Sequence, residues 1–214
     1  MNQLLVQNSE LAKKLLIAVV IAVPVAELAA TYVGRGRGRG GVRAAFVEAL
    51  MLRGQSAAPA DRGTKPVLVL SMVLAIFAAA RIAERSTLQF GANGWGTFAL
   101  GIAVTLAGIA LRSWGVVTLG RYFRREVVVV EGQHVVRSGP YRWIRHPAYA
   151  GDLLFAFGLG LAIGSWVAAV AALAIAFAGH LPRIRVEEAE LTRTLGVEYT
   201  EYAESTARLV PGVW

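Results

Sequence analysis

The amino-acid sequence predicts an all-α, polytopic membrane protein, and its composition, long hydrophobic runs and clustered basic residues support this prediction. The chain of 214 residues is 56% hydrophobic and only 17% charged, with a mean hydropathy of +0.52. Charged residues make up roughly a quarter of an ordinary soluble domain. The sequence contains no cysteine, which excludes disulfides, thiolate metal sites and a thiol nucleophile.

Each long hydrophobic run predicts a transmembrane helix, because about 20 mostly apolar residues cross the hydrocarbon layer. The first three runs are Leu11–Val33, Lys65–Ala83 and Trp95–Leu119. The run Pro147–Gly179 is longer and is interrupted at Gly164 and Ser165, so we expect two antiparallel helices joined by a tight turn. The sequence therefore predicts about five transmembrane helices. The last two form a helical hairpin, and the first helix of this hairpin is shorter than a full crossing.

The distribution of Lys and Arg predicts how these helices are oriented, because cytoplasmic loops retain positive charge. Residues 34–66 contain seven basic residues, 120–146 contain six, the segment from 180 onward contains four and 81–94 contains two. This pattern places the N-terminus outside and the C-terminus in the cytoplasm. The segment His180–Leu191 then continues the last helix into the cytoplasm, with a kink expected near Pro182.

The net charge of +8 is explained better by a membrane surface than by a nucleic acid. The basic residues lie in short segments between apolar runs, where they can contact lipid headgroups. The Gly-Arg repeat Gly34–Gly41 is not a phosphate-binding loop, because it follows a membrane helix and lacks a Lys-Ser/Thr ending. We expect a basic linker there, followed by an interfacial helix at Val42–Arg53. Membrane lipids are thus predicted partners, and nucleic acid is not.

The segment Ser138–Gly151 concentrates polar side chains directly before the hydrophobic hairpin. Pro147 suits the first position of a helix, so Arg145 and His146 lie just before a helix N-terminus, whose partial positive charge attracts anions. Arg145 can bind a carboxylate through two N–H groups, and Tyr141 and Tyr149 can add hydroxyl donors. The alternative is interfacial anchoring, for which Trp, Tyr and Arg are common residues. These residues alone leave both interpretations open.

The predicted cytoplasmic continuation of the last helix places opposite charges on one face. Arg183 and Glu187 are four residues apart, and Arg185 and Glu188 are three apart. A solvated helix with ion pairs explains either pair by itself. If this helix packs beside Arg145, the face presents both charges to a pocket. Such a pocket suits a ligand that carries an ammonium and a carboxylate.

Two carboxylates lie within or at the edge of predicted membrane helices, where an ionisable group is expected to be paired or functional. For Glu27 the candidate partner is Arg112. Asp152 can instead interact with the dipole of its own helix. The three histidines, His134, His146 and His180, share no metal-binding helix motif, so no metal site is predicted.

Several ordered segments of the second half together resemble the isoprenylcysteine carboxyl methyltransferase family. They are Leu119–Phe123, Gln133–Gly151, Gly164–Trp166, Arg183–Leu191, Gly196–Tyr202 and Arg208–Gly212. The resemblance covers about residues 112–214. It divides the chain into N-terminal transmembrane helices with a basic linker at 1–111, which match no family motif, and a methyltransferase-like catalytic region at 112–214.

The resemblance implies a membrane enzyme that transfers a methyl group from S-adenosylmethionine to the carboxylate of an isoprenylcysteine-like substrate entering from the bilayer. It implies a cytosol-facing cofactor pocket, with Arg183 at the substrate carboxylate and Arg145 at the carboxylate of either substrate or cofactor. The implied cofactor-binding residues are Gln133, His134, Val135, Val136, Tyr141, His146, Pro147, Ala148, Tyr149 and Glu187. A carboxylate nucleophile is already ionised at neutral pH, so such a site needs alignment and exclusion of water rather than a strong base.

Three other functions fit parts of the same pattern. A membrane methyltransferase can act on a lipid amine, although an amine gains less from Arg183 than a carboxylate does. A sterol-reductase-like enzyme would use NADPH and would need further basic residues around its phosphate. A non-enzymatic membrane scaffold would use the arginines and aromatic residues as anchors.

Overall fold

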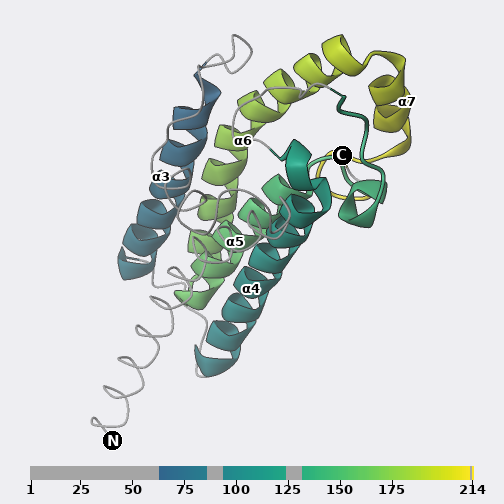
Figure 1. Ribbon diagram of the computed structural model, residues 1–214. Helices are drawn as coiled ribbons and strands as arrows, with labels where there is room; N and C mark the ends of the chain where they lie inside the picture. Colours follow the sequence, from purple (N-terminus) through teal and green to yellow (C-terminus); the bar gives the residue numbers. More distant parts are fainter. Residues whose placement is uncertain (1–62, 86–93, 124–131, 213) are drawn as a thin grey trace, which may run out of the picture.

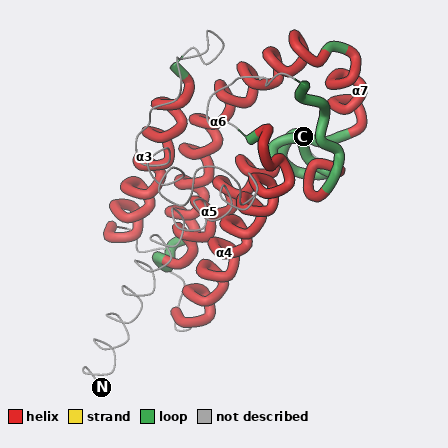
Figure 2. The backbone as a smooth tube through the Cα atoms, viewed as in Figure 1, coloured by secondary structure: helices red, strands yellow, loops and turns green. Residues whose placement is uncertain are grey.

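The computed structural model describes residues 63–85, 94–123, 132–212 and 214 (Figure 1). The helix expected at Leu11–Val33, the linker Gly34–Gly41, the segment Val42–Arg53 and Glu27 lie outside these residues. Within the described ranges the chain forms helices joined by loops (Figure 2). The single β-type pairing found there is an isolated parallel bridge between Ile144 and Ala207.

The helices follow the hydrophobic runs closely. In chain order the elements are α3 (Thr64–Arg85), α4 (Gly94–Leu119), η1 (Gly120–Tyr122), η2 (Gly139–Arg142), α5 (Pro147–Ala162), α6 (Trp166–Leu195) and α7 (Val197–Ser205). Three of the described helices are long and apolar enough to cross a membrane, with spans at Thr64–Ile82, Trp95–Leu119 and Trp166–Leu195. The helix α5 is apolar but shorter, as the sequence predicts. The chain is therefore a membrane-embedded, all-helical protein in its described part.

The predicted hairpin turn lies where Gly164 and Ser165 interrupt the fourth run. Gly164 has φ of 92°, a conformation that residues with a Cβ rarely adopt. Ser165 is the N-cap of α6, and its Oγ accepts a hydrogen bond from the Ala168 N–H at 3.2 Å. The glycine reverses the chain and the serine starts the next helix, so the prediction of two antiparallel helices is confirmed.

Glycines bring α4 and α5 into backbone contact. A Cβ on Gly151 would lie 2.6 Å from the carbonyl oxygen of Gly108, and a Cβ on Gly158 would lie 2.5 Å from the amide nitrogen of Thr105. Small residues let two membrane helices approach closely, which strengthens packing where lipid offers no hydrophobic driving force. These two helices consequently form one tightly joined pair (Figure 1).

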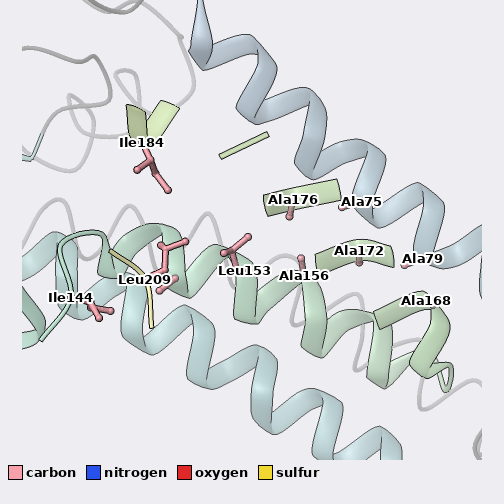
Figure 3. Packing of buried hydrophobic residues seen from close by; sticks show 11 residues of the cluster. Ala75, Ala79, Ile144, Leu153, Ala156, Ala168, Ala172, Ala176, Ile184 and Leu209 are labelled. Atoms are coloured by element: carbon pink, nitrogen blue, oxygen red, sulfur yellow. The ribbon is translucent and has the colours of Figure 1, made fainter. Parts of the chain in front are cut away.

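Alanines line the interface between α3 and α6, and α6 lies between α3 and α5. Ala75 and Ala79 of α3 are buried near Ala172 and Ala176 of α6 (Figure 3). The backbone of α6 is also close to α3 at Gly179, where a Cβ would collide with the Ser71 side chain. The bundle is thus held by small side chains rather than by large interlocking ones.

The helix α6 extends beyond the bundle, as the sequence predicts. It continues through Pro182 to Leu195, and its C-terminal part leans away from α3 towards α7 (Figure 1). This part of α6 comes close to the N-terminus of α5 and to the segment after α7. The polar motifs of the second half therefore meet at one end of the bundle.

Candidate active site

The turn before α5 and the extension of α6 converge on the hydroxyl of Tyr149. This hydroxyl donates a hydrogen bond to Glu187 Oε2 at 2.7 Å. Arg183 Nε lies 3.4 Å from the same hydroxyl oxygen. The expected shared face of Arg183 and Glu187 is confirmed, and it is directed at α5. Pro147 occupies the first turn of α5, with His146 as its N-cap, as predicted.

Arg183 and Glu187 have different surroundings. The Arg183 residue is 4% exposed, and its Nη1 donates a hydrogen bond to Thr64 Oγ1 of α3 at 3.2 Å. Glu187 is half-buried, and within the described part of the chain it accepts one hydrogen bond, from Tyr149. A carboxylate can accept about four hydrogen bonds. Glu187 therefore keeps capacity for a further donor, such as a cation or a hydroxyl group.

Glu188, which sequence reasoning did not select, organises the corner beside this site. Its Oε1 accepts hydrogen bonds from Arg145 Nε at 3.0 Å and from His146 Nε2 at 3.2 Å. Its Oε2 accepts one from Arg208 Nε at 2.9 Å. The exposed Arg185 is not among these partners, so among the described residues the alternative of an ion pair between Arg185 and Glu188 is not the one formed. Hydrogen bonds between charged groups are stronger than neutral ones, and two of the three that fix this carboxylate come from arginines.

Arg145 is bound to protein groups on every side that the structure describes. Besides Glu188, its Nη1 contacts the carbonyl oxygens of Ala203, at 2.5 Å, and Thr206. The sequence led us to expect this guanidinium at a ligand carboxylate. The geometry favours a different role, in which Arg145 holds α6 and the segment after α7 against the start of α5.

The segment after α7 runs alongside the residues that precede α5. The Arg145 N–H donates to Ala207 O at 2.8 Å, and the His146 N–H donates to Arg208 O at 3.0 Å. Together with the isolated bridge at Ile144, these bonds fasten residues 206–209 along residues 143–146. This pairing gives a structural reason for the Arg208–Gly212 motif, whose arginine also binds Glu188.

The remaining expected cofactor residues lie between η1, α7 and η2. The Val135 N–H donates to Glu198 Oε1 at 2.9 Å, and His134 Nδ1 lies 3.3 Å from the Tyr122 hydroxyl. Tyr141 is buried, and its carbonyl oxygen accepts a hydrogen bond of 2.6 Å from the Tyr202 hydroxyl. Gln133 and Val136 flank this segment, and Ala148 lies half-buried in the first turn of α5.

Tyr141 interacts electrostatically with Glu187 of α6. Burial raises the pKa of Tyr141 well above its ordinary value, and the negative charge of Glu187 adds to the effect. The phenol is therefore neutral at physiological pH and lies within electrostatic reach of Glu187. The expected site residues thus surround one end of the bundle rather than being scattered along it.

A separate cluster of charged side chains lies deeper between the helices. Asp152 Oδ2 of α5 lies 2.8 Å from Arg112 Nη1 of α4 and 3.2 Å from His180 Nε2 of α6. His180 is fully buried, and its Nδ1 lies 2.7 Å from Ala176 O. The pairing expected for an ionisable group in a membrane helix is confirmed for Asp152. Its partner is Arg112, which the sequence had suggested as a partner for Glu27.

Comparison with protein families matches residues 100–193 to the Isoprenylcysteine carboxyl methyltransferase (ICMT) family. The resemblance inferred from the motifs is confirmed. The matched residues include most of α4, all of α5 and nearly all of α6, and they contain the Arg-His-Pro step, Glu187 and Glu188. The segments Gly196–Tyr202 and Arg208–Gly212 lie beyond the match.

The chain is also similar to individual curated proteins, which carry different names. The chain is 34% identical over 121 residues to protein-S-isoprenylcysteine O-methyltransferase A of Arabidopsis thaliana, an alignment that covers 56% of this chain and 61% of that protein. It is 33% identical over 129 residues to the cobalt-zinc-cadmium resistance protein CzcN of Cupriavidus metallidurans, covering 59% of this chain and 57% of that protein. The chain thus spans about three fifths of the length of these relatives.

The fold is similar to that of a solved family structure. The eukaryotic intramembrane Ras methyltransferase ICMT superposes with a TM-score of 0.69 and 20% sequence identity, over 94% of this chain and 67% of that protein. At this sequence identity the comparison shows that the two proteins share an arrangement of helices. The helical bundle described above therefore has the same arrangement of helices as that membrane protein.

Proposed function

We propose that the chain is a membrane methyltransferase that transfers a methyl group from S-adenosylmethionine to the carboxylate of a lipophilic, isoprenylcysteine-like substrate. The observation that carries this proposal is the single Tyr149 hydroxyl that contacts both Glu187 and Arg183. The hydroxyl holds an anion and a cation side by side at the end of an apolar bundle. The family match and the name of the Arabidopsis relative support the reaction class.

The residues fit the cofactor in charge and in hydrogen-bonding capacity. S-adenosylmethionine carries an ammonium, ribose hydroxyls and a positively charged sulfonium, and the half-buried Glu187 has unused acceptor capacity for such groups. When bound, the cofactor supplies an electrophilic methyl group. We propose that Glu187 holds its polar end, and that the other contacts come from Gln133, His134, Val135, Val136, Tyr141, His146, Pro147, Ala148 and Tyr149.

Arg183 fits the role of substrate-carboxylate ligand. Its guanidinium is buried and already held by Thr64 and Tyr149, so it is oriented before substrate arrives. A buried cation attracts a carboxylate strongly once water is excluded, and the carboxylate needs no base to become a nucleophile. Arg145 acts as a positioning residue through Glu188 in this scheme. A neutral or cationic amine would gain nothing from Arg183.

The proposed topology places this site at the cytoplasmic face, where soluble cofactor is available. About five membrane-spanning segments follow from the hydrophobic runs of the sequence. An outside N-terminus and an inside C-terminus follow from the distribution of Lys and Arg. The lipophilic part of the substrate would then enter from the bilayer, and its carboxylate would stay near the interface. In this scheme residues 112–214 carry the catalytic region, and 1–111 provide further membrane contacts.

A methyl-transfer assay with the full chain in lipid nanodiscs tests this proposal. Labelled S-adenosylmethionine is offered with an isoprenylcysteine bearing a free carboxylate, with its methyl ester, or with a lipid amine of similar size. We expect label in the product of the free acid alone. Transfer to the amine, or binding of NADPH in place of S-adenosylmethionine, would overturn the assignment.

Two substitutions separate the proposed roles of the α6 residues. Glu187→Ala should abolish cofactor binding measured by calorimetry. Arg183→Ala should retain cofactor binding and lose turnover or substrate capture. Unchanged cofactor affinity in the Glu187 variant would remove that residue from the cofactor site.

A further inference from the structure

Tyr199 of α7 is buried with its hydroxyl group unpaired. The residue is 4% exposed, and among the described residues its hydroxyl has no hydrogen-bond partner. The hydroxyls of Tyr122, Tyr149 and Tyr202 all have partners. A buried polar group without a partner costs about 1–3 kcal/mol. Such a group calls for an explanation, and a ligand that completes the hydrogen bond is one.

The position of Tyr199 in α7 points to the proposed cofactor site. The preceding residue, Glu198, accepts the hydrogen bond from Val135, and Tyr202 donates to the carbonyl oxygen of Tyr141. The rings of Tyr199 and Tyr202 are 6.1 Å apart. The contacts of Glu198 and Tyr202 therefore hold α7 against Val135 and Tyr141, which we propose as cofactor-binding residues.

The main charges that act on Tyr199 are those of Glu188 and Glu187 on α6 and of Arg145. Burial raises the pKa of Tyr199 well above its ordinary value, with the negative charges of Glu188 and Glu187 adding to the effect and Arg145 opposing it. The phenol consequently keeps its proton at physiological pH. It is available as a hydrogen-bond donor, and the negative charges of Glu188 and Glu187 act on it.

We infer that Tyr199 is a cofactor-contacting residue whose hydroxyl hydrogen-bonds to the polar end of S-adenosylmethionine, the end that Glu187 holds. The inference rests on the proposed function and extends it beyond the residues that the sequence selects. In the free protein the hydroxyl is unsatisfied, and the bound cofactor supplies an acceptor such as its carboxylate or a ribose oxygen. Part of the binding free energy therefore comes from giving a hydrogen-bond partner to a buried hydroxyl that destabilises the free protein.

The matched pair Tyr199→Phe and Tyr202→Phe tests this inference. Both tyrosines are 4% exposed and lie on α7, but only the Tyr202 hydroxyl has a partner. Thermal unfolding is measured for the full chain without ligand, and affinity for S-adenosylhomocysteine is measured by calorimetry. The first readout is independent of the cofactor assignment.

We expect Tyr199→Phe to affect mainly affinity for S-adenosylhomocysteine and Tyr202→Phe to affect mainly thermal stability. Without ligand, Tyr199→Phe should unfold at the wild-type temperature or higher, since it removes an unpaired polar atom, whereas Tyr202→Phe should unfold at a lower temperature. Affinity for S-adenosylhomocysteine should fall about 3- to 10-fold in Tyr199→Phe, which corresponds to one lost hydrogen bond. The fall should be smaller in Tyr202→Phe.

Each other outcome has a defined meaning. Wild-type affinity in Tyr199→Phe would overturn this inference and leave the proposed function standing. An equal loss of affinity in both variants would show that α7 acts only as a support, and lower stability of ligand-free Tyr199→Phe would show that the hydroxyl already has a partner. Absence of binding by the wild-type chain would instead count against the proposed function.

Discussion

Asp152 of α5 and Arg112 of α4 form an ion pair, with 2.8 Å between Oδ2 and Nη1, across an interface where glycines bring the two backbones into contact. The carboxylate is 15% exposed and the guanidinium 19% exposed. His180 contacts the same carboxylate oxygen from α6. One acidic side chain therefore connects three helices of the bundle.

Removing this carboxylate should destabilise the fold. Asp152→Ala leaves two nitrogen-bearing side chains without their acceptor, and breaking one partner of a buried pair costs about 3–5 kcal/mol. The double variant Asp152→Leu with Arg112→Met should recover part of this loss, because it removes both charges. Denaturant unfolding in detergent measures both values. Strictly additive effects of Asp152→Leu and Arg112→Met, each also measured alone, would contradict a direct interaction.

The adjacent carboxylates of α6 should give opposite phenotypes. Glu188→Ala frees Arg145, His146 and Arg208 at once, and we expect a loss of about 3–5 kcal/mol in unfolding free energy. Glu187→Ala removes one hydrogen bond from Tyr149, so its stability cost should be about 1 kcal/mol. Unfolding curves alongside cofactor titrations compare the two. The distinction fails if Glu187→Ala is the less stable variant.

The close approach of α4 and α5 should not tolerate a methyl group at its centre. In Gly151→Ala the new Cβ would lie 2.6 Å from Gly108 O and 2.8 Å from Arg112 N, both backbone atoms that can move only with their helix. We expect a loss of about 1–3 kcal/mol from overpacking. Gly96→Ala on α4 is the control, because a Cβ there meets nothing within 4 Å. Equal thermal stability of both variants would argue against this packing.

Stability of the α7 region should fall at alkaline pH and not at neutral pH. Burial raises the pKa of Tyr202 to about 12, above its ordinary value of 10.0, so the folded state prefers the neutral phenol. The stabilising effect is complete below pH 10 and is lost as pH rises from 10 towards 12. Tyrosinate absorbance and unfolding temperature, followed over this range, check the prediction. Titration of Tyr202 near pH 10 would refute it.

Hydropathy and turn residues were sufficient to predict the described helices. The runs 65–83 and 95–119 became α3 and α4 with ends shifted by one or two residues, because an apolar run in a membrane has few alternatives to a helix. The Gly164 and Ser165 interruption located the hairpin turn. The helix expected at Leu11–Val33 lies outside the described residues, so the number of spans stays a prediction.

The site was predictable only in outline. The motifs identified Tyr149, Arg183 and Glu187, which the structure brings together, but the sequence could not distinguish the partners of Glu187 from those of Glu188. Neighbouring helix positions differ by about 100° in direction, and only the packing of α5 against α6 decides which one faces it. Arg208 reaches Glu188 through a long-range chain reversal that local patterns do not encode. A possible signal for Tyr199 was its place in the Gly196–Tyr202 motif.

The strap formed by residues 206–209 has a consequence for biosynthesis. These residues are translated after α3 to α7, so the helices can enter the membrane while the corner around Glu188 still lacks Arg208 and the Thr206 carbonyl that accepts from Arg145. Insertion and maturation of the protein are therefore separate events in time. A nascent chain halted after α7 would be a membrane-integrated but immature polypeptide.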